Sequence, residues 1–274
     1  MLWSERTRRE RRSRGDSESE AFLGSRDDRP IMDTDVAVVG GGVAGRVAAT
    51  YTARHDFETV VYDTGESILR RNAHLENVPG FPAGVNARQW LSLLGEGAER
   101  AGARLERAEV TRVAESGEGF VVETAGGATT HAPRVVLATK NAVEYLDVDG
   151  VGVIDRGKMF LDTDEAGRTG VEGCYAAGRL AEKPHQAAIA AGHGAAVAVA
   201  LLEDADVGFY HDWVAPEGYF TGRDRDVPPG CAEIDEDEWE TRERASAAVM
   251  RERFDDPNLE PPEQHPSVAE EESQ

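Results

Sequence analysis

Residues 35–51 read DVAVVGGGVAGRVAATY, a short apolar run that meets three glycines and continues with the spacing of a helix. Gly40, Gly42 and Gly45 fit the pattern G-x-G-x-x-G. The first glycine of this pattern permits a tight turn, the second lets a pyrophosphate approach the backbone, and the third lets the helix pack closely on the strand. Free N–H groups at the start of such a helix attract phosphate. The stretch therefore predicts a strand, a turn and a helix that bind a dinucleotide.

A second apolar run lies at the distance that this motif requires. Residues 59–63 (TVVYD) are predicted to form a strand, and Asp63 at its end lies 23 residues after Gly40. An acidic residue at that place binds a ribose hydroxyl in dinucleotide-binding folds. A glycine-rich turn without a ligand is the alternative, but the strand, the helix and the acidic residue together favour a binding site.

The composition restricts the class of partner. The 274 residues are 40% apolar and carry 30 basic against 52 acidic side chains, for a net charge of −22. Such a chain repels nucleic acid and anionic membranes, and no apolar run approaches the roughly 20 residues of a membrane span. Only three of the basic residues are lysine, and residues 232–274 carry about half of the acidic excess. We interpret this pattern as salt adaptation. Two isolated cysteines, Cys174 and Cys231, indicate a reducing cytoplasm and no metal site.

The order of the apolar runs predicts an α/β fold. After the long loop 64–85 we expect a helix that Asn86 caps, a β-meander (104–110, 111–115 and 120–124), strands at 134–139, 159–162 and 173–178, and a buried helix at 185–203. These elements predict a single Rossmann-like domain over residues 32–206, with a parallel sheet and a meander. Residues 1–31 are expected to be a disordered, arginine-rich leader, with Met32 as a possible start of translation. Residues 207–274 are expected to form an aromatic loop, a polar helix and an acidic disordered tail.

Five segments resemble the flavin-binding domain of the low-molecular-weight thioredoxin reductases. They are VVGGGVAG (38–45), Asp63, LENVPGFP (75–82), VVLATK (135–140) and TGVEGCYAAGRLAEKPHQAAIAAGHGAA (169–196). The segments follow one another in the order of that family and span roughly residues 34–204. The resemblance implies that the dinucleotide is FAD.

The resemblance also implies which residues touch the cofactor. It places Val110 at the adenine, Thr139 near the pyrophosphate, Gly178 near the ribityl phosphate, and Asn77 in the loop beside the flavin. Gln186 and Ala187 are expected at the flavin pyrimidine edge, where a helix N-terminus stabilises negative charge. The full set of predicted cofactor-binding residues is Gly40, Gly42, Val43, Ala44, Gly45, Asp63, Asn77, Val110, Thr139, Gly178, Gln186 and Ala187.

Three departures from that family limit the functional interpretation. The family inserts a nicotinamide domain with a redox dicysteine before the last strand, and here only residues 141–158 occupy that place. Arg179 replaces the aspartate that normally accepts a ribityl hydrogen bond, which arginine cannot do. Lys140 stands where the family has glycine. Arg179 and Lys140 are open to two interpretations, as contacts to a phosphate or carboxylate or as solvated surface residues.

Several further side chains lie where they could adjoin the flavin. The loop segment RRNAH (70–74) ends in His74, and His185 precedes the predicted pyrimidine-edge residues. A basic group near a flavin raises its potential and a histidine moves protons, but a loop that merely covers the cofactor is an equal alternative. No catalytic residue is predicted. Cys174 lies in an apolar strand and is expected to be inert.

The sequence predicts an FAD-dependent oxidoreductase without dithiol chemistry or its own NADPH domain. The electron donor or acceptor is then a diffusing molecule or a partner protein, and a homodimer is possible. The main alternative is a non-catalytic flavin-binding or regulatory protein. A biosynthetic protein that uses the dinucleotide as a substrate, as thiazole synthases do, is a third interpretation that the motifs after Asp63 do not favour.

Overall fold

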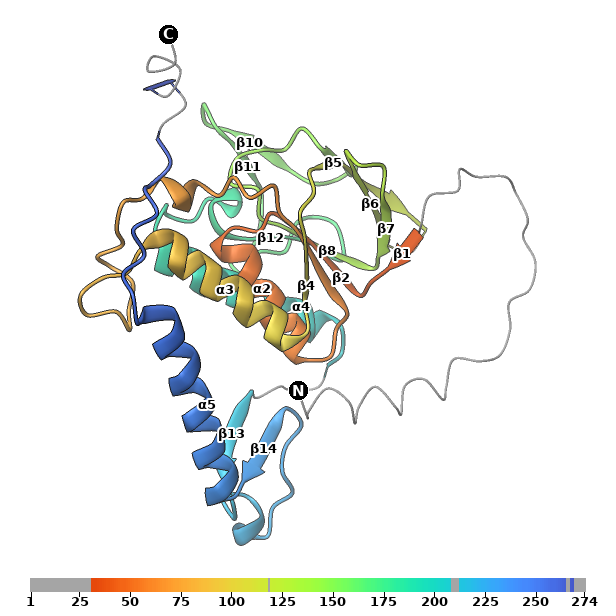
Figure 1. Ribbon diagram of the computed structural model, residues 1–274. Coiled ribbons are helices and arrows are strands. Elements are labelled where there is room, and N and C mark those ends of the chain that lie inside the picture. The colour runs from red at the N-terminus through yellow and green to blue at the C-terminus, as the bar shows by residue number, and fades with distance from the viewer. Residues whose placement is uncertain (1–30, 118, 208–211, 265–266, 269–274) are drawn as a thin grey trace. The chain divides into compact units, whose positions relative to one another are not determined.

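The computed structural model describes residues 31–117, 119–207, 212–264 and 267–268 (Figure 1). The chain divides into two compact units, residues 1–201 and 202–274. The first unit holds the predicted dinucleotide-binding motif. Its core is a five-stranded parallel sheet with helices on one face and a second sheet on the other.

The parallel sheet has the strand order β12-β8-β2-β3-β4. Its strands are β2 (Val36–Val39), β3 (Thr59–Tyr62), β4 (Arg104–Glu106), β8 (Arg134–Leu137) and β12 (Cys174–Ala176). The chain builds outward from β2 through β3 to β4, and later from β8 to β12 on the other side of β2. The order therefore reverses between β2 and β8. In open α/β sheets, ligands bind beyond the carboxyl ends of the strands at such a point.

The two faces of the sheet are covered by different partners. Val36 and Val38 of β2 pack against α2 (Val43–Arg54) and α4 (Ala187–Asp204), and α3 (Ala87–Ala101) packs beside α2 (Figure 1). Ala37 and Val39 point the other way and pack against the second sheet. Strand residues are apolar on both faces because both faces are buried, as expected for a parallel sheet.

The second sheet has the order β1-β7-β6-β5-β9. Its strands are β1 (Ile31–Asp33), β5 (Val110–Ser116), β6 (Gly119–Thr124), β7 (Thr129–Ala132) and β9 (Leu146–Asp147). The antiparallel run β5-β6-β7 is the meander, but the prediction that it begins with a strand at 104–110 is wrong. Residues 104–106 instead pair in parallel with β3 as β4, because Ala103 and Leu105 pack into the helical face of the sheet. Residue 31, assigned to the leader, belongs to β1.

The loop 64–85 is held in place by its own apolar residues. It contains the 3-10 helix η1 (Ile68–Arg71) and a bridge between Leu75 and Val85. Its buried side chains pack against α3 and against the first residues of α2 and α4. The predicted cap of α3 is confirmed, because the Asn86 side chain accepts the N–H groups of Arg88 and Gln89. The loop thus forms a fixed wall next to the glycine motif.

Helix α4 forms part of the core. Its second half buries Val197, Ala198 and Leu201 in the cluster that α2 and the sheet share, and a side chain on Gly194 would come within 2.2 Å of the Ala44 carbonyl oxygen. By length and composition alone, α4 is the helix of the described residues that could cross a membrane. Its packing on α2 is that of a core helix.

The second unit contains more regular structure than the predicted aromatic loop. It consists of β13 (Trp213–Pro216), η3 (Thr221–Arg223), β14 (Cys231–Ile234) and α5 (Glu236–Phe254), and β13 pairs in parallel with β14. Trp213, Tyr219 and Phe220 contact one another edge to face. Phe209 and Tyr210, two further aromatic residues of the predicted loop, lie outside the described residues.

Helix α5 satisfies its own ends. The Asp235 side chain accepts the N–H of Glu238, acidic residues fill the first turn, and arginines occupy the last turn. These charges complement the helix dipole. Glu238 and Arg242 form an ion pair one turn apart, as do Glu240 and Arg244. The predicted polar helix is therefore confirmed.

Two further strands connect β9 to the end of the parallel sheet. They are β10 (Val153–Asp155) and β11 (Met159–Leu161), which form an antiparallel pair. The 3-10 helix η2 (Gly178–Ala181) directly follows β12. Side chains near the carboxyl edge of the sheet come from three segments, which are the turn after β8, the turn between β10 and β11, and η2 after β12.

Candidate dinucleotide-binding site

The three motif glycines have different structural roles. Gly40 has φ +109°, and a Cβ there would lie 2.6 Å from the Ala138 carbonyl oxygen. A Cβ on Gly45 would lie 2.0 Å from the Gly40 carbonyl oxygen, so this glycine lets α2 pack on β2. Gly42 has an extended backbone, and a Cβ there would meet only the Ser67 hydroxyl at 3.8 Å. The chain path requires Gly40 and Gly45, whereas the space in front of Gly42 is open.

The N-terminus of α2 faces this open space. No side chain caps it, and the first turn contains no acidic residue. The first N–H groups of a helix have no acceptor within the helix, so those of Val43, Ala44 and Gly45 are available to a ligand. The dipole of α2 adds positive potential at the same end. This arrangement suits a phosphate group.

Asp63 is held beside the motif by Arg46, a residue that the sequence pattern did not single out. The Asp63 Oδ2 atom lies 2.8 Å from Nη2 of Arg46, and its Oδ1 accepts the N–H of Gly65 at 2.7 Å. Arg46 also donates to the carbonyl oxygens of Gly41 and Leu91. Both side chains are largely buried, with 12% and 14% exposure. The pair fixes the carboxylate, and a carboxylate retains further acceptor positions for a hydroxyl. The sequence did contain a signal for this role of Arg46, since it is an arginine in the first turns of a helix that is otherwise rich in alanine, valine and threonine.

Gly178 brings the end of β12 against α2. It has φ +67°, and a Cβ there would lie 2.9 Å from the Ala44 Cβ. Its N–H donates to Nδ1 of His193 on α4, at 2.9 Å. His193 is buried, and this burial, with a smaller effect from the Lys183 charge, lowers its pKa to about 4. The ring is therefore neutral, with its proton on Nε2.

Asn77 and Gln186, both predicted at the flavin, meet in the structure. The Asn77 amide donates to the Gln186 side-chain oxygen at 2.9 Å, across 109 residues of sequence. Both side chains are exposed, and Ala187 begins α4 and packs against the buried residues of loop 64–85. The loop and the start of α4 therefore form one polar edge.

Two predicted residues lie nearby with other contacts. The Thr139 hydroxyl donates to the Ala142 carbonyl oxygen at 2.7 Å and lies 2.9 Å from the Tyr145 hydroxyl, so it is satisfied within the chain. Val110 is the first residue of β5. It comes two residues after Ala108, whose N–H donates to the Asp63 carbonyl oxygen. Val110 is thus near the acidic residue of the motif.

The two cysteines are free thiols. Cys174 is buried in β12, and burial raises the pKa of its thiol to about 12, although a contact with Thr169 opposes this. A thiol that stays protonated is a poor nucleophile. Cys231 lies in the second unit, in β14.

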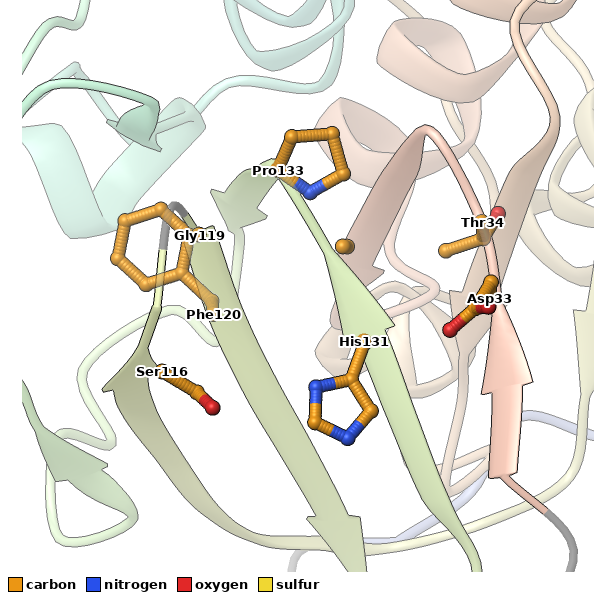
Figure 2. A pocket seen from close by; sticks show the side chains of 8 residues that line it. Asp33, Thr34, Ser116, Gly119, Phe120, His131 and Pro133 are labelled. Atoms are coloured by element: carbon orange, nitrogen blue, oxygen red, sulfur yellow. The ribbon is translucent and has the colours of Figure 1, made fainter. Parts of the chain in front are cut away.

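A pocket elsewhere in the first unit is lined by none of the predicted residues. It lies at one end of the second sheet, where side chains of β1, β6 and β7 converge (Figure 2). Its lining is Asp33, Thr34, Ser116, Gly119, Phe120, His131, Ala132 and Pro133. It presents no helix N-terminus and is separate from the glycine motif.

Comparison with known proteins agrees with this geometry. Residues 38–96 match a family described as the NAD(P)-binding Rossmann-like domain. The chain is 36% identical over 119 residues to the bifunctional thioredoxin reductase/thioredoxin of Mycobacterium leprae, covering 42% of this chain and 26% of that protein. It is 33% identical over 136 residues to the thioredoxin reductase of Treponema pallidum, covering 48% of this chain and 43% of that protein. The chain thus spans less than half the length of these relatives.

Solved structures show the same fold. A thioredoxin reductase from Gloeobacter violaceus superposes with a TM-score of 0.54 at 20% identity, covering 62% of this chain and 94% of that one. An oxidoreductase from Agrobacterium tumefaciens superposes with a TM-score of 0.57 at 16% identity, covering 65% and 100%. The fold and the glycine site define a Rossmann-like dinucleotide-binding domain with an oxidoreductase-like fold. More narrowly, the domain resembles the flavin-binding domain of thioredoxin reductases, to which the chain is related in sequence.

Proposed function

We propose that this chain binds FAD at the N-terminus of α2 and acts as an oxidoreductase in which the flavin carries the electrons. The observation that carries the proposal is the open space at Gly42, in front of an uncapped helix and beside the fixed Asp63 carboxylate. The same end of the sheet contains the reversal of strand order between β2 and β8. These features fit a pyrophosphate and its ribose.

The path of the chain after β4 favours FAD over a nicotinamide dinucleotide. The chain continues into a meander rather than into further alternating strands and helices, and its curated relatives are thioredoxin reductases. The Asn77–Gln186 pair and the start of α4 supply polar groups and a positive helix end for the flavin pyrimidine edge. A bound flavin would supply the electron transfer, and the protein would hold and orient it.

Dithiol chemistry is not part of this proposal. The sequence has two cysteines 57 positions apart, and the thiol of Cys174 is held protonated by burial. Between β8 and β12 the chain contains the short strands β9, β10 and β11, where thioredoxin reductases insert the domain that binds NADPH. The electron donor is therefore a diffusing reductant or a partner protein. Salt adaptation accompanies this proposal because the chain is strongly acidic, and a cytoplasmic location because cysteine is scarce.

The absorption spectrum of the purified full chain in high salt tests the proposal. We expect a flavin band whose released cofactor is FAD, and bleaching of that band by NADH, NADPH or another biological reductant. A chain that binds no FAD on titration would contradict the proposal. Bound FAD that no biological reductant reduces would favour the non-catalytic alternative. Replacement of Cys174 and Cys231 by alanine is expected to leave the reduction rate unchanged, and a large loss with the fold intact would restore dithiol chemistry.

A further inference from the structure

Four cations gather near the carboxyl edge of the parallel sheet, from four separate segments. Arg71 ends η1, Lys140 follows β8, Lys158 lies in the β10–β11 turn, and Arg179 belongs to η2. We call these four residues the cation cluster. Two of the three lysines of the whole chain belong to it. Such a concentration is unexpected in a protein with a net charge of −22.

Direct contacts tie three of the four segments together, and Arg71 acts on Lys140 through its charge. Nε of Arg179 donates to the Asn141 side-chain oxygen at 3.2 Å, and the Asn141 amide donates to the Met159 carbonyl oxygen at 2.8 Å. The guanidinium of Arg179 lies 5.6 Å from the centre of the Phe160 ring. Asn141 follows Lys140 in the chain, and Met159 follows Lys158. These contacts therefore hold the two lysines and Arg179 on one framework.

The cations act on one another. Partial burial, followed by the charges of Arg71, Lys158 and Arg179, lowers the pKa of Lys140. Burial and the charges of Arg179, Lys140 and Lys158 likewise lower the pKa of His185. The charge contributions, which come second to burial in both shifts, place several positive charges around Lys140 and His185, and an anion would relieve their repulsion.

The cluster has no carboxylate of its own. Among the described residues, Arg71, Lys140, Lys158 and Arg179 form no ion pair with an acidic side chain, although the chain has 52 acidic residues. Arg156, in the same turn as Lys158, does pair with Glu182, at 3.2 Å. An acidic side chain is thus close by, but it pairs with Arg156 and not with any of the four cations of the cluster. A ligand from solution is a natural source of the missing negative charge.

Lys140 also has a costly backbone. Its φ is +67°, in the left-handed region that glycine adopts freely and other residues rarely do. Strained residues of this kind persist where the surrounding structure holds them, and they gather at functional sites. A lysine at a position suited to glycine is therefore a candidate for a functional residue.

We propose that the cation cluster binds a small molecule that carries two or more phosphate or carboxylate charges. The protein's negative field repels extended polyanions, whereas a small anion can be surrounded by four cations. The cluster adjoins the candidate dinucleotide site, because Lys140 follows Thr139 and His185 precedes Gln186. The proposal concerns side chains outside the predicted FAD contacts and does not depend on FAD binding.

Calorimetric titration of the full chain at fixed ionic strength tests this site. The probes are inorganic pyrophosphate and citrate, which separate a phosphate from a carboxylate preference, and binding of either one supports the proposal. We expect Lys140→Gln and Lys158→Gln each to weaken that binding about tenfold, as for the loss of one charge-assisted contact. Lys183→Gln is the matched control, because the Lys183 charge acts on His193 and not on the cluster. It should change the affinity less than about twofold.

Further measurements distinguish the cation cluster from the glycine motif, and distinguish loss of the Lys140 charge from a change in backbone strain. Binding should persist in the FAD-saturated protein and in Gly42→Val. Lys140→Gly should lose the anion without a fall in melting temperature, since glycine relieves the left-handed backbone. The proposal is overturned if neither probe binds, if saturation with FAD or Gly42→Val abolishes binding, or if Lys183→Gln weakens it as much as the cluster variants. Because Lys158 is exposed in a turn, its variant keeps the test valid if Lys140 variants fold poorly.

Discussion

Alanine at Gly42 and alanine at Gly45 should have opposite effects on ligand binding and stability. Gly42 has φ −75° and ψ −171°, which any residue adopts, and its Cβ would meet only the Ser67 hydroxyl at 3.8 Å. Gly42→Ala should therefore fold and gain about 0.4–1 kcal/mol through a less flexible unfolded chain. At Gly45 the Cβ would lie 2.0 Å from the Gly40 carbonyl oxygen. Gly45→Ala must push β2 and α2 apart, which costs about 1–3 kcal/mol or more.

For FAD binding, in contrast to stability, Gly42→Ala should be the damaging substitution. If a pyrophosphate rests on the N–H groups at the start of α2, a methyl group at Gly42 displaces it. Loss of two charge-assisted hydrogen bonds, at about 1.5–3 kcal/mol each, amounts to about 3–6 kcal/mol. This corresponds to roughly 10²- to 10⁴-fold weaker FAD binding, and Gly42→Val should lose binding entirely.

Thermal unfolding without ligand and FAD titration by flavin fluorescence measure the two effects separately. Gly45→Ala should lower the melting temperature by about 2–12 °C, whereas Gly42→Ala should not lower it. Neither alanine contacts the ion pair of Arg46 and Asp63, so both variants should keep the Asp63 carboxylate in place. A Gly42→Ala protein that folds normally and binds FAD as tightly as the parent would refute the assignment of the site.

Three further outcomes are expected. Arg46→Met leaves the largely buried Asp63 carboxylate without its cation and should lower the free energy of unfolding by about 3–5 kcal/mol. The double variant Arg46→Met/Asp63→Asn should recover most of this loss, because it also removes the unpaired charge. A loss below about 1 kcal/mol in Arg46→Met would contradict a stabilising role of the ion pair. Because burial lowers the pKa of His193 to about 4, the unfolded chain binds a proton first below about pH 6.5. The contribution of His193 to the free energy of unfolding should therefore be full above that pH and fall toward pH 4. Chemical denaturation of His193→Gln at several pH values should show a flatter dependence of this free energy on pH. An unchanged dependence would count against a neutral His193 ring. Salt should stabilise the full chain, because it screens the mutual repulsion of the acidic side chains; equal melting temperatures in low and high salt would contradict salt adaptation.

The local part of the site could be predicted from neighbouring residues. Strand, turn and helix in residues 35–51 depend on apolar spacing and on glycines whose roles are set within a few positions, and the Asn86 cap depends on residues two and three places away. The acidic Asp63 could be assigned because it ends the next strand of the same unit. For the same reason the order of the motifs was enough to predict the resemblance to thioredoxin reductases.

Contacts between distant segments could not be predicted in this way. Arg46 reaches Asp63 only because β2 and β3 are neighbours in the sheet, and Asn77 meets Gln186 across 109 residues. The short run at 104–106 has no periodicity that separates an edge of the parallel sheet from the start of a meander, and pairing with β3 decides the outcome.

The cation cluster shows the same division most clearly. The sequence by itself marked Lys140 and Arg179 as unusual, and it set the acidic charge of the chain. Which cations lie together depends on four segments that the folded chain brings to one edge of the sheet, and so does the fact that no carboxylate among the described residues pairs with them. Local spacing determines the elements, because a helix or strand needs only its near neighbours. Long-range electrostatics and side-chain pairing exist only after the chain has closed on itself, and so the tertiary structure decided the site.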